Sequence, residues 1–224
     1  MLATKDSTSN TMLRALARTR NALDAASELD VDRSNADRDF FATEKALIDA
    51  HFEKVDAAER AVYLHDLREK RKHQARIVVG DAVLDRGVRR GKKRVALETN
   101  VETADRVFAE DISELVDAER HLEPGLVLDC VGRLTKDVDF NGKSDLVTDL
   151  TGRAQRQADN FQAREAAERI ESSLEADLEQ AISKAADALY GLEKRLLERF
   201  PRDKPYVRAF FLDVGPKRKK SGNE

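Results

Sequence analysis

A seven-residue repeat of apolar side chains runs through residues 35–62, NADRDFFATEKALIDAHFEKVDAAERAV. Phe41, Ile48, Val55 and Val62 occupy the repeated position. A repeat of this period keeps one stripe of a helix against a partner helix, as in coiled coils. Because no proline follows before Leu97, we expect one helix over residues 35–97, roughly 95 Å long at about 1.5 Å per residue.

The rest of the chain predicts further helices separated by polar turns. Thr99 and Glu102 have the spacing of a capping box, and Asp139–Gly142 carries a strong turn signal. We expect helices at about 9–28, 35–97, 101–138 with a kink at Pro124, 144–200 and 206–213. The predicted fold is all-α, an elongated antiparallel helical bundle or coiled coil with three long helices and a short N-terminal helix. A single domain would cover 9–213, between disordered segments at 1–8 and 214–224.

The composition favours the same fold class. The chain has 224 residues, of which 37% are charged, with 4 Pro, 10 Gly and no Trp. So few helix breakers argue against a loop-rich β fold. One cysteine excludes an internal disulfide and fits a reducing compartment. No apolar run approaches the roughly 20 residues that span a bilayer, and no secretory signal is apparent. We therefore expect a cytoplasmic protein.

Three glycines inside the long predicted helix share one face. Gly80, Gly87 and Gly91 are spaced by seven and four residues. Each costs about 1 kcal/mol of helix propensity relative to Ala. They therefore mark either a close crossing with another helix or a break in the helix.

A second apolar seam lies near the C-terminal end of the predicted helix at 144–200. Its members alternate spacings of three and four residues, and they are Ile182, Ala185, Leu189, Leu192 and Leu196. Counting helix lengths leaves this seam without a partner in the same chain, and an exposed stripe of that size usually marks an interface. We therefore predict a homodimer through this seam. The alternative is a chain that breaks at its glycines and folds back into a compact bundle.

Basic residues cluster before the predicted turn near residue 99. Residues 71–96 carry nine Lys or Arg and two acidic residues, whereas residues 97–145 carry five and thirteen. An antiparallel hairpin would place Arg94 opposite Asp105, Arg89 opposite Glu110 and Arg86 near Glu114, so we favour a structural role for the cluster. The alternative is a surface that binds anions such as nucleic acid or lipid. The cluster comprises Arg86, Arg89, Arg90, Lys92, Lys93 and Arg94.

A second basic run, Lys217, Arg218, Lys219 and Lys220, lies in the C-terminal tail. Apolar residues beside a polybasic run can dock on an anionic membrane, although a solvated tail is the simpler interpretation. A short amphipathic N-terminal helix, long kinked helices and basic clusters together resemble the plan of BAR domains. That resemblance implies peripheral membrane binding.

Motifs for catalysis or metal binding are absent from the sequence. None of the four histidines has Glu three residues before it, as the pairs of a di-iron bundle require. Glu44, His51 and His65 lie at multiples of seven, so we expect polar seam positions that fix helix register. Cys130 lies among apolar residues and is expected to be a buried thiol. No phosphate-binding loop or nucleophile elbow occurs.

These observations predict a non-enzymatic structural or scaffolding protein with no cofactor and no metal. Its long helices would set a distance, and its seam would select a protein partner. The alternatives are a BAR-like membrane-binding module and a nucleic-acid-binding protein that uses residues 86–94. The net charge of −3 and the acidic 97–145 region make nucleic acid the weaker alternative.

Overall fold

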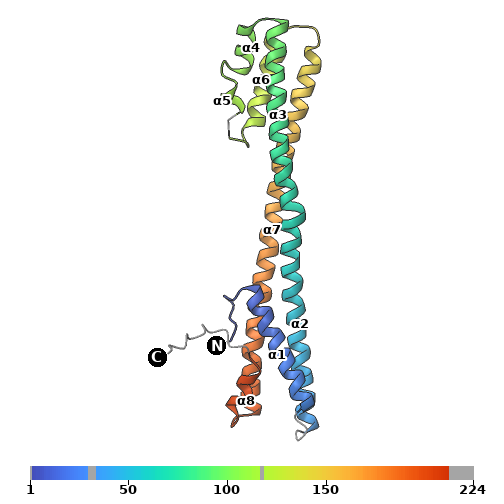
Figure 1. Ribbon diagram of the computed structural model, residues 1–224, viewed down its shortest axis with the longest axis vertical. Helices are drawn as coiled ribbons and strands as arrows, with labels where there is room; N and C mark the ends of the chain where they lie inside the picture. Colours follow the sequence, from blue (N-terminus) through green and yellow to red (C-terminus); the bar gives the residue numbers. More distant parts are fainter. Residues whose placement is uncertain (1, 30–33, 117–118, 212–224) are drawn as a thin grey trace, which may run out of the picture. The chain divides into compact units, whose positions relative to one another are not determined.

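The computed structural model describes residues 2–29, 34–116 and 119–211, which form helices and turns with no strand (Figure 1). The prediction of an all-α fold is confirmed, whereas the elongated antiparallel arrangement stays a prediction. Contacts between Cα atoms divide the chain into two compact units. Unit 1 comprises Met1–Leu64 and Glu171–Glu224, and unit 2 comprises His65–Ile170. Each unit has its own apolar core, and the single domain over 9–213 stays a prediction.

Helices in the described part of the chain follow the predicted order, with new boundaries in the middle. Their bounds are α1 Ser9–Leu29, α2 Asn35–His65, π-helix η1 Asp66–Lys70, α3 Arg71–Glu98, α4 Val101–Phe108, α5 Ser113–Val116, α6 Glu123–Asp137, α7 Lys143–Arg199 and α8 Lys204–Ala209. Unit 1 contains α1, α2, α8 and the part of α7 from Glu171 onward. Unit 2 contains η1, α3 to α6 and the part of α7 up to Ile170.

The core of unit 1 lies between α1, α2 and α7. The seven-residue repeat of α2 is buried at Phe41, Ile48 and Val55, as a helix-packing repeat requires. From α7 come the side chains of the predicted seam, which are all buried. The expectation that this seam has no partner within the chain is wrong, because α1 contacts it as well as α2. From α1 the covering residues are Met12, Ala15, Leu16 and Leu23.

The two ends of the chain also contribute to unit 1. Ala3 is buried in the core, so the N-terminal segment predicted to be disordered is ordered at this residue. The last helix begins earlier than predicted, because Asp203 is its N-cap and accepts a hydrogen bond from Tyr206 N at 3.1 Å. Phe41 stacks with Phe200 and Phe210, at centroid distances of 5.9 and 5.8 Å.

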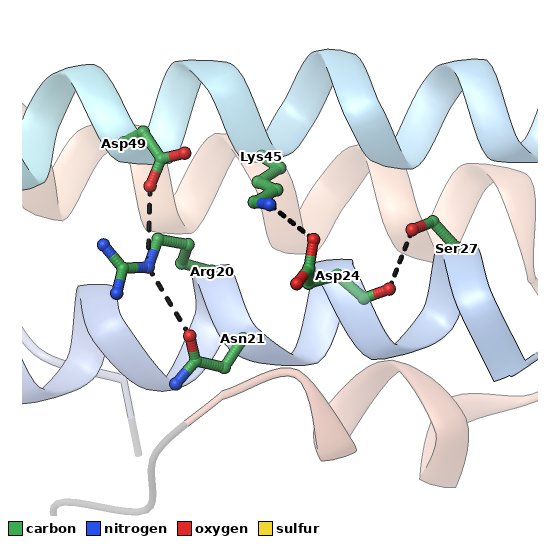
Figure 2. Close-up of polar contacts among 6 residues, drawn as sticks. All are labelled: Arg20, Asn21, Asp24, Ser27, Lys45 and Asp49. Atoms are coloured by element: carbon green, nitrogen blue, oxygen red, sulfur yellow. Dashed lines mark hydrogen bonds and ion pairs between the residues drawn. The ribbon is translucent and has the colours of Figure 1, made fainter.

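Polar side chains join the helices of unit 1 beside this core. Figure 2 shows Lys45 of α2 paired with Asp24 of α1, and Arg20 of α1 with its Nε 3.6 Å from Asp49 Oδ1 of α2. Ser27 Oγ donates to the Asp24 carbonyl at 2.7 Å in the same view. These pairs bridge α1 and α2 at two successive turns, which helps to fix their register.

Unit 2 packs α3, α4, α6 and α7 around a second core. Gly91 of α3 lies where a Cβ atom would be 3.2 Å from Phe108 Cζ and 3.3 Å from Leu150 Cδ1. A Cβ atom at Gly87 would lie 2.6 Å from Arg153 Cδ of α7. Beside Gly80, the buried Gln157 of α7 donates to the Ile77 carbonyl of α3 at 3.1 Å. The three glycines therefore lie at a close crossing of α3 and α7.

The continuous helix predicted for 35–97 changes geometry away from its glycines. Helix α3 runs without interruption from Arg71 to Glu98. The departure from α geometry lies at η1, Asp66–Lys70, where one turn is π-helical. Such a turn holds an additional residue and rotates the side chains that follow it. At the same level His65 Nε2 lies 2.8 Å from the Ala167 carbonyl of α7.

The single helix predicted for 101–138 is wrong, because three shorter helices occupy this range. Helix α4 ends where Ala109 takes a φ of 74°, which an α-helix cannot contain. Pro124 lies in the first turn of α6 and produces no kink, since its missing N–H needs no acceptor there. Asn100, not Thr99, caps α4, and it accepts from Thr103 N at 2.7 Å.

Candidate functional site

Four basic residues on one face of α3 form what we call the basic stripe: Arg86, Arg89, Arg90 and Lys93. Their spacings of three, four and seven place them on adjacent turns, over about 10 Å of helix. All four side chains are exposed. Among the described residues they make no ion pair, so their charges face solvent.

The other two members of the predicted cluster are engaged in the structure of unit 2. Lys92 Nζ lies 2.7 Å from Asp105 Oδ1 of α4 and donates to the carbonyls of Ala109 and Glu110, each at 2.7 Å. The Arg94 guanidinium lies over the Phe140 ring, 5.9 Å from its centroid. A hairpin of α3 and α4 therefore exists, but Lys92 replaces Arg94 as the partner of Asp105.

The remaining pairs predicted for this hairpin are not formed among the described side chains. Glu110 is exposed and makes no ion pair with Arg89, and the side chain of Glu114 lies outside the described residues. Hydrogen bonds from Ser113 lower the pKa of Asp111, and the charges of Lys92 and Arg89 add to this effect. The structural role predicted for the whole cluster thus applies to Lys92 and Arg94, and leaves the stripe available.

A groove runs alongside the basic stripe. It has a volume of about 680 Å³, and Ala96 and Ile112 supply its apolar lining. Lys92 holds the carbonyls of Ala109 and Glu110, and this contact places Ile112 at the groove. The complete lining is Arg86, Arg89, Arg90, Lys92, Lys93, Ala96 and Ile112.

The stripe carries an electrostatic cost in the free protein. Arg86 and Arg90, and Arg89 and Lys93, are like charges four residues apart on one helix face. Each such pair destabilises a helix by about 0.2–0.5 kcal/mol. An anion bound along the stripe would remove the repulsion.

Other residues singled out from the sequence have structural surroundings. Burial raises the pKa of the Cys130 thiol, and Arg133 Nη2 lies 3.2 Å from its Sγ. The Glu44 carboxylate of α2 accepts two hydrogen bonds from the Arg195 guanidinium of α7 in a bidentate arrangement, at 2.6 and 2.7 Å. Among the described residues, no group of three His, Cys, Asp or Glu side chains could hold a metal ion. Lys217, Arg218, Lys219 and Lys220 lie outside the described residues.

Sequence reasoning missed one buried carboxyl group. Glu123 at the start of α6 is fully buried in unit 2. Burial raises its pKa to about 9, and the neighbouring carboxyl groups of Asp85 and Asp81 on α3 act in the same direction. Arg120 Nε lies 3.2 Å from Asp81 Oδ2. No pattern around Glu123 indicates this burial, since it depends on how α6 packs against α3.

None of the described helices combines the length and the apolar character needed to cross a membrane. The apolar face of α1, which the membrane interpretation would insert into lipid, is buried in the core of unit 1. Comparison of the chain with protein-family models, curated proteins and solved structures gave no match.

Proposed function

We propose that this protein is a non-catalytic helical interaction module that binds an acidic partner protein through the basic stripe of α3. The observation that supports the proposal is the stripe itself, four exposed cations on adjacent turns without an ion pair among the described residues. Three of the four are arginines, whose planar fork can bind a carboxylate with two parallel hydrogen bonds.

The energetics of the stripe suit a partner with several carboxylates. A single exposed ion pair contributes about 0.2–1 kcal/mol, so one acidic residue would bind weakly. Four cations within about 10 Å act together, and a partner that neutralises them also relieves their mutual repulsion. Because the site is exposed, its affinity falls as salt rises, with a screening length of about 8–10 Å at physiological ionic strength.

One observation favours an acidic protein over a membrane. The apolar face of the N-terminal helix is buried in the core of unit 1, so it does not face a lipid surface. Self-association would need a surface other than the buried seam at residues 182–196.

The test compares two variants that each lose four positive charges from unit 2. The stripe variant carries Arg86→Gln, Arg89→Gln, Arg90→Gln and Lys93→Gln. The control variant removes three exposed arginines and one exposed lysine elsewhere, through Arg68→Gln, Arg106→Gln, Lys136→Gln and Arg169→Gln. Labelled poly-L-glutamate, phosphatidylserine vesicles and duplex DNA are titrated with each full-length protein at low and physiological salt.

The proposal expects salt-dependent binding of poly-L-glutamate by the wild type and the control variant, and loss of most of it in the stripe variant. Vesicle or DNA binding that exceeds poly-L-glutamate binding would overturn the acidic-protein assignment. Equal losses in the two variants would overturn the stripe as the site, because net charge alone would then explain the effect.

A further inference from the structure

The exposed face of α3 continues beyond the basic stripe in both directions. Val79 and Val83 lie seven residues before Arg86 and Arg90, and Leu97 lies seven residues after Arg90. The valines are 62% and 37% exposed, and Leu97 is 86% exposed. We call this side of α3 the outer face. It consists of Val79 and Val83, then the basic stripe, then Leu97, and it extends over about 27 Å of helix.

The opposite side of α3 has the same seven-residue spacing of apolar residues, and there it forms a buried helix contact. Ile77 and Leu84 are buried seven residues apart, as are Val88 and Val95. These side chains pack against the other helices of unit 2. A surface helix normally carries polar residues away from the core. Helix α3 instead repeats the seven-residue spacing of a helix contact on both sides. Among the described residues, only the edge of the outer side at Val79 and Val83 meets another helix, where Arg153 and Arg156 of α7 line a groove with the two valines.

The groove beside the stripe adds shape to this face. Its volume of about 680 Å³ lies in the range of about 300–1,000 Å³ seen for binding pockets, so it admits large side chains. Ala96 and Ile112 give it an apolar surface, while the cations line its open edge. An apolar side chain in this groove would have carboxylates one turn away facing the stripe.

We propose that the outer face of α3 binds an acidic amphipathic helix of a partner protein. Asp or Glu side chains at spacings of three, four and seven residues would face the stripe, and apolar residues seven positions away would cover Val79, Val83 and Leu97. One large apolar side chain would enter the groove at Ile112. This inference rests on the proposed function and specifies the form of the acidic partner.

The geometry favours a helix over an acidic chain without structure. Carboxylates on an extended strand recur on one side at about 6.6–6.8 Å, which does not match cations spaced by turns of a helix. A helix presents both its charges and its apolar residues with the seven-residue period of the outer face. The charge complementarity and the groove thus select the same partner geometry.

The test uses two synthetic peptides of identical composition. The helical probe places four Glu at positions i, i+3, i+4 and i+7, with Leu seven residues before and after on the same face. The permuted probe distributes the same Glu and Leu around the helix. Binding to the full-length protein is followed by fluorescence anisotropy, with poly-L-glutamate as the reference for charge alone.

Protein variants separate the apolar contribution from the charge. Val79→Ser with Leu97→Ser removes two exposed apolar side chains of the outer face. Val101→Ser with Leu122→Ser removes two side chains of unit 2 that are 65% and 52% exposed, as the matched control. Because all four are exposed, neither pair should unfold the protein, and circular dichroism verifies this for each variant.

We expect the helical probe to bind about tenfold more tightly than the permuted probe, since buried apolar area adds to the shared charge term. The outer-face pair should lose about threefold to tenfold in affinity for the helical probe, and the control pair should lose none. Equal affinity for both peptides and poly-L-glutamate would overturn this inference and leave the proposed function intact. Failure of every anionic probe would overturn both.

Discussion

In unit 1 charged side chains beside the core meet partners across the helices, whereas in unit 2 the basic stripe meets none among the described residues. Glu44 is almost fully buried and is bound by Arg195, and Lys45 pairs with Asp24. The stripe of α3 has four exposed cations and exposed apolar neighbours. Helices with the same seven-residue repeat can therefore be fully covered within the chain, or can keep one face exposed to another molecule.

The largest expected effect concerns the completed core of unit 1. Leu192 is fully buried, so Leu192→Ala should destabilise the protein by about 4 kcal/mol through lost burial and the cavity left behind. Leu97→Ala, on the outer face of α3, should change stability by less than about 0.5 kcal/mol. Urea unfolding of both variants checks the pair. Similar losses would show that the outer face is covered in the free protein.

The second prediction concerns the buried carboxyl of unit 2. Below its unfolded pKa, Glu123 is protonated in both states. As pH rises toward about 9, the folded protein keeps a proton that the unfolded chain releases, so stability falls. Glu123→Gln removes this loss. The variant should gain about 3 kcal/mol relative to the wild type between about pH 5 and pH 7.5, at about 1.36 kcal/mol per pKa unit.

Parallel urea titrations of the wild type and Glu123→Gln across this pH range measure the gain. A constant stability difference between the two proteins would contradict the assigned protonation of Glu123. Asp139→Asn, which changes an exposed carboxylate of unit 2 to an amide, is measured alongside as the control substitution.

The third prediction tests the ion pair that completes unit 1. Arg195→Ala leaves the Glu44 carboxylate buried without its two hydrogen bonds, which should cost about 2 kcal/mol. Arg90→Ala, on the basic stripe, should cost less than about 0.5 kcal/mol. Thermal or urea unfolding distinguishes the two, and equal effects would remove the contrast between the units.

The smallest expected effect is a gain in stability. The stripe variant with four Gln substitutions loses its like-charge repulsion, so it should be more stable than the wild type by about 0.5–1 kcal/mol at low salt. This gain should vanish at high salt, where the charges are screened. The control variant in Arg68, Arg106, Lys136 and Arg169 should show no such gain. Destabilisation of the stripe variant would mean that its cations have partners in the free protein.

Local signals in the sequence were sufficient for much of the fold. The turn at Gly142, with a φ of 82°, places the start of α7 close to the predicted residue. The break at Ala109 had no such signal, because alanine is a strong helix former. The break depends on Lys92 of α3, which donates hydrogen bonds to the carbonyls of Ala109 and Glu110.

The sequence was sufficient to identify the basic residues of the candidate site, but not to show which of them pair within the chain. All four stripe residues belong to the cluster found in the sequence. Whether each cation faces another helix or solvent depends on its position around the helix, which changes by about 100° per residue. Lys92 faces α4 and pairs with Asp105, while its neighbour Lys93 faces solvent. The prediction that the seam at residues 182–196 has no partner within the chain was wrong for a similar reason. Counting helix lengths cannot show that α1 and α2 both cover the seam.

The most direct test of the central claim is residue-by-residue modification of arginine with phenylglyoxal, read by mass spectrometry with and without the helical acidic probe. We expect Arg86, Arg89 and Arg90 to react readily in the free protein and to be protected in the complex. Arg106 and Arg169, which are exposed outside the outer face, should react alike in both. Low reactivity of the stripe arginines in the free protein, or no protection by a probe that binds, would contradict the account.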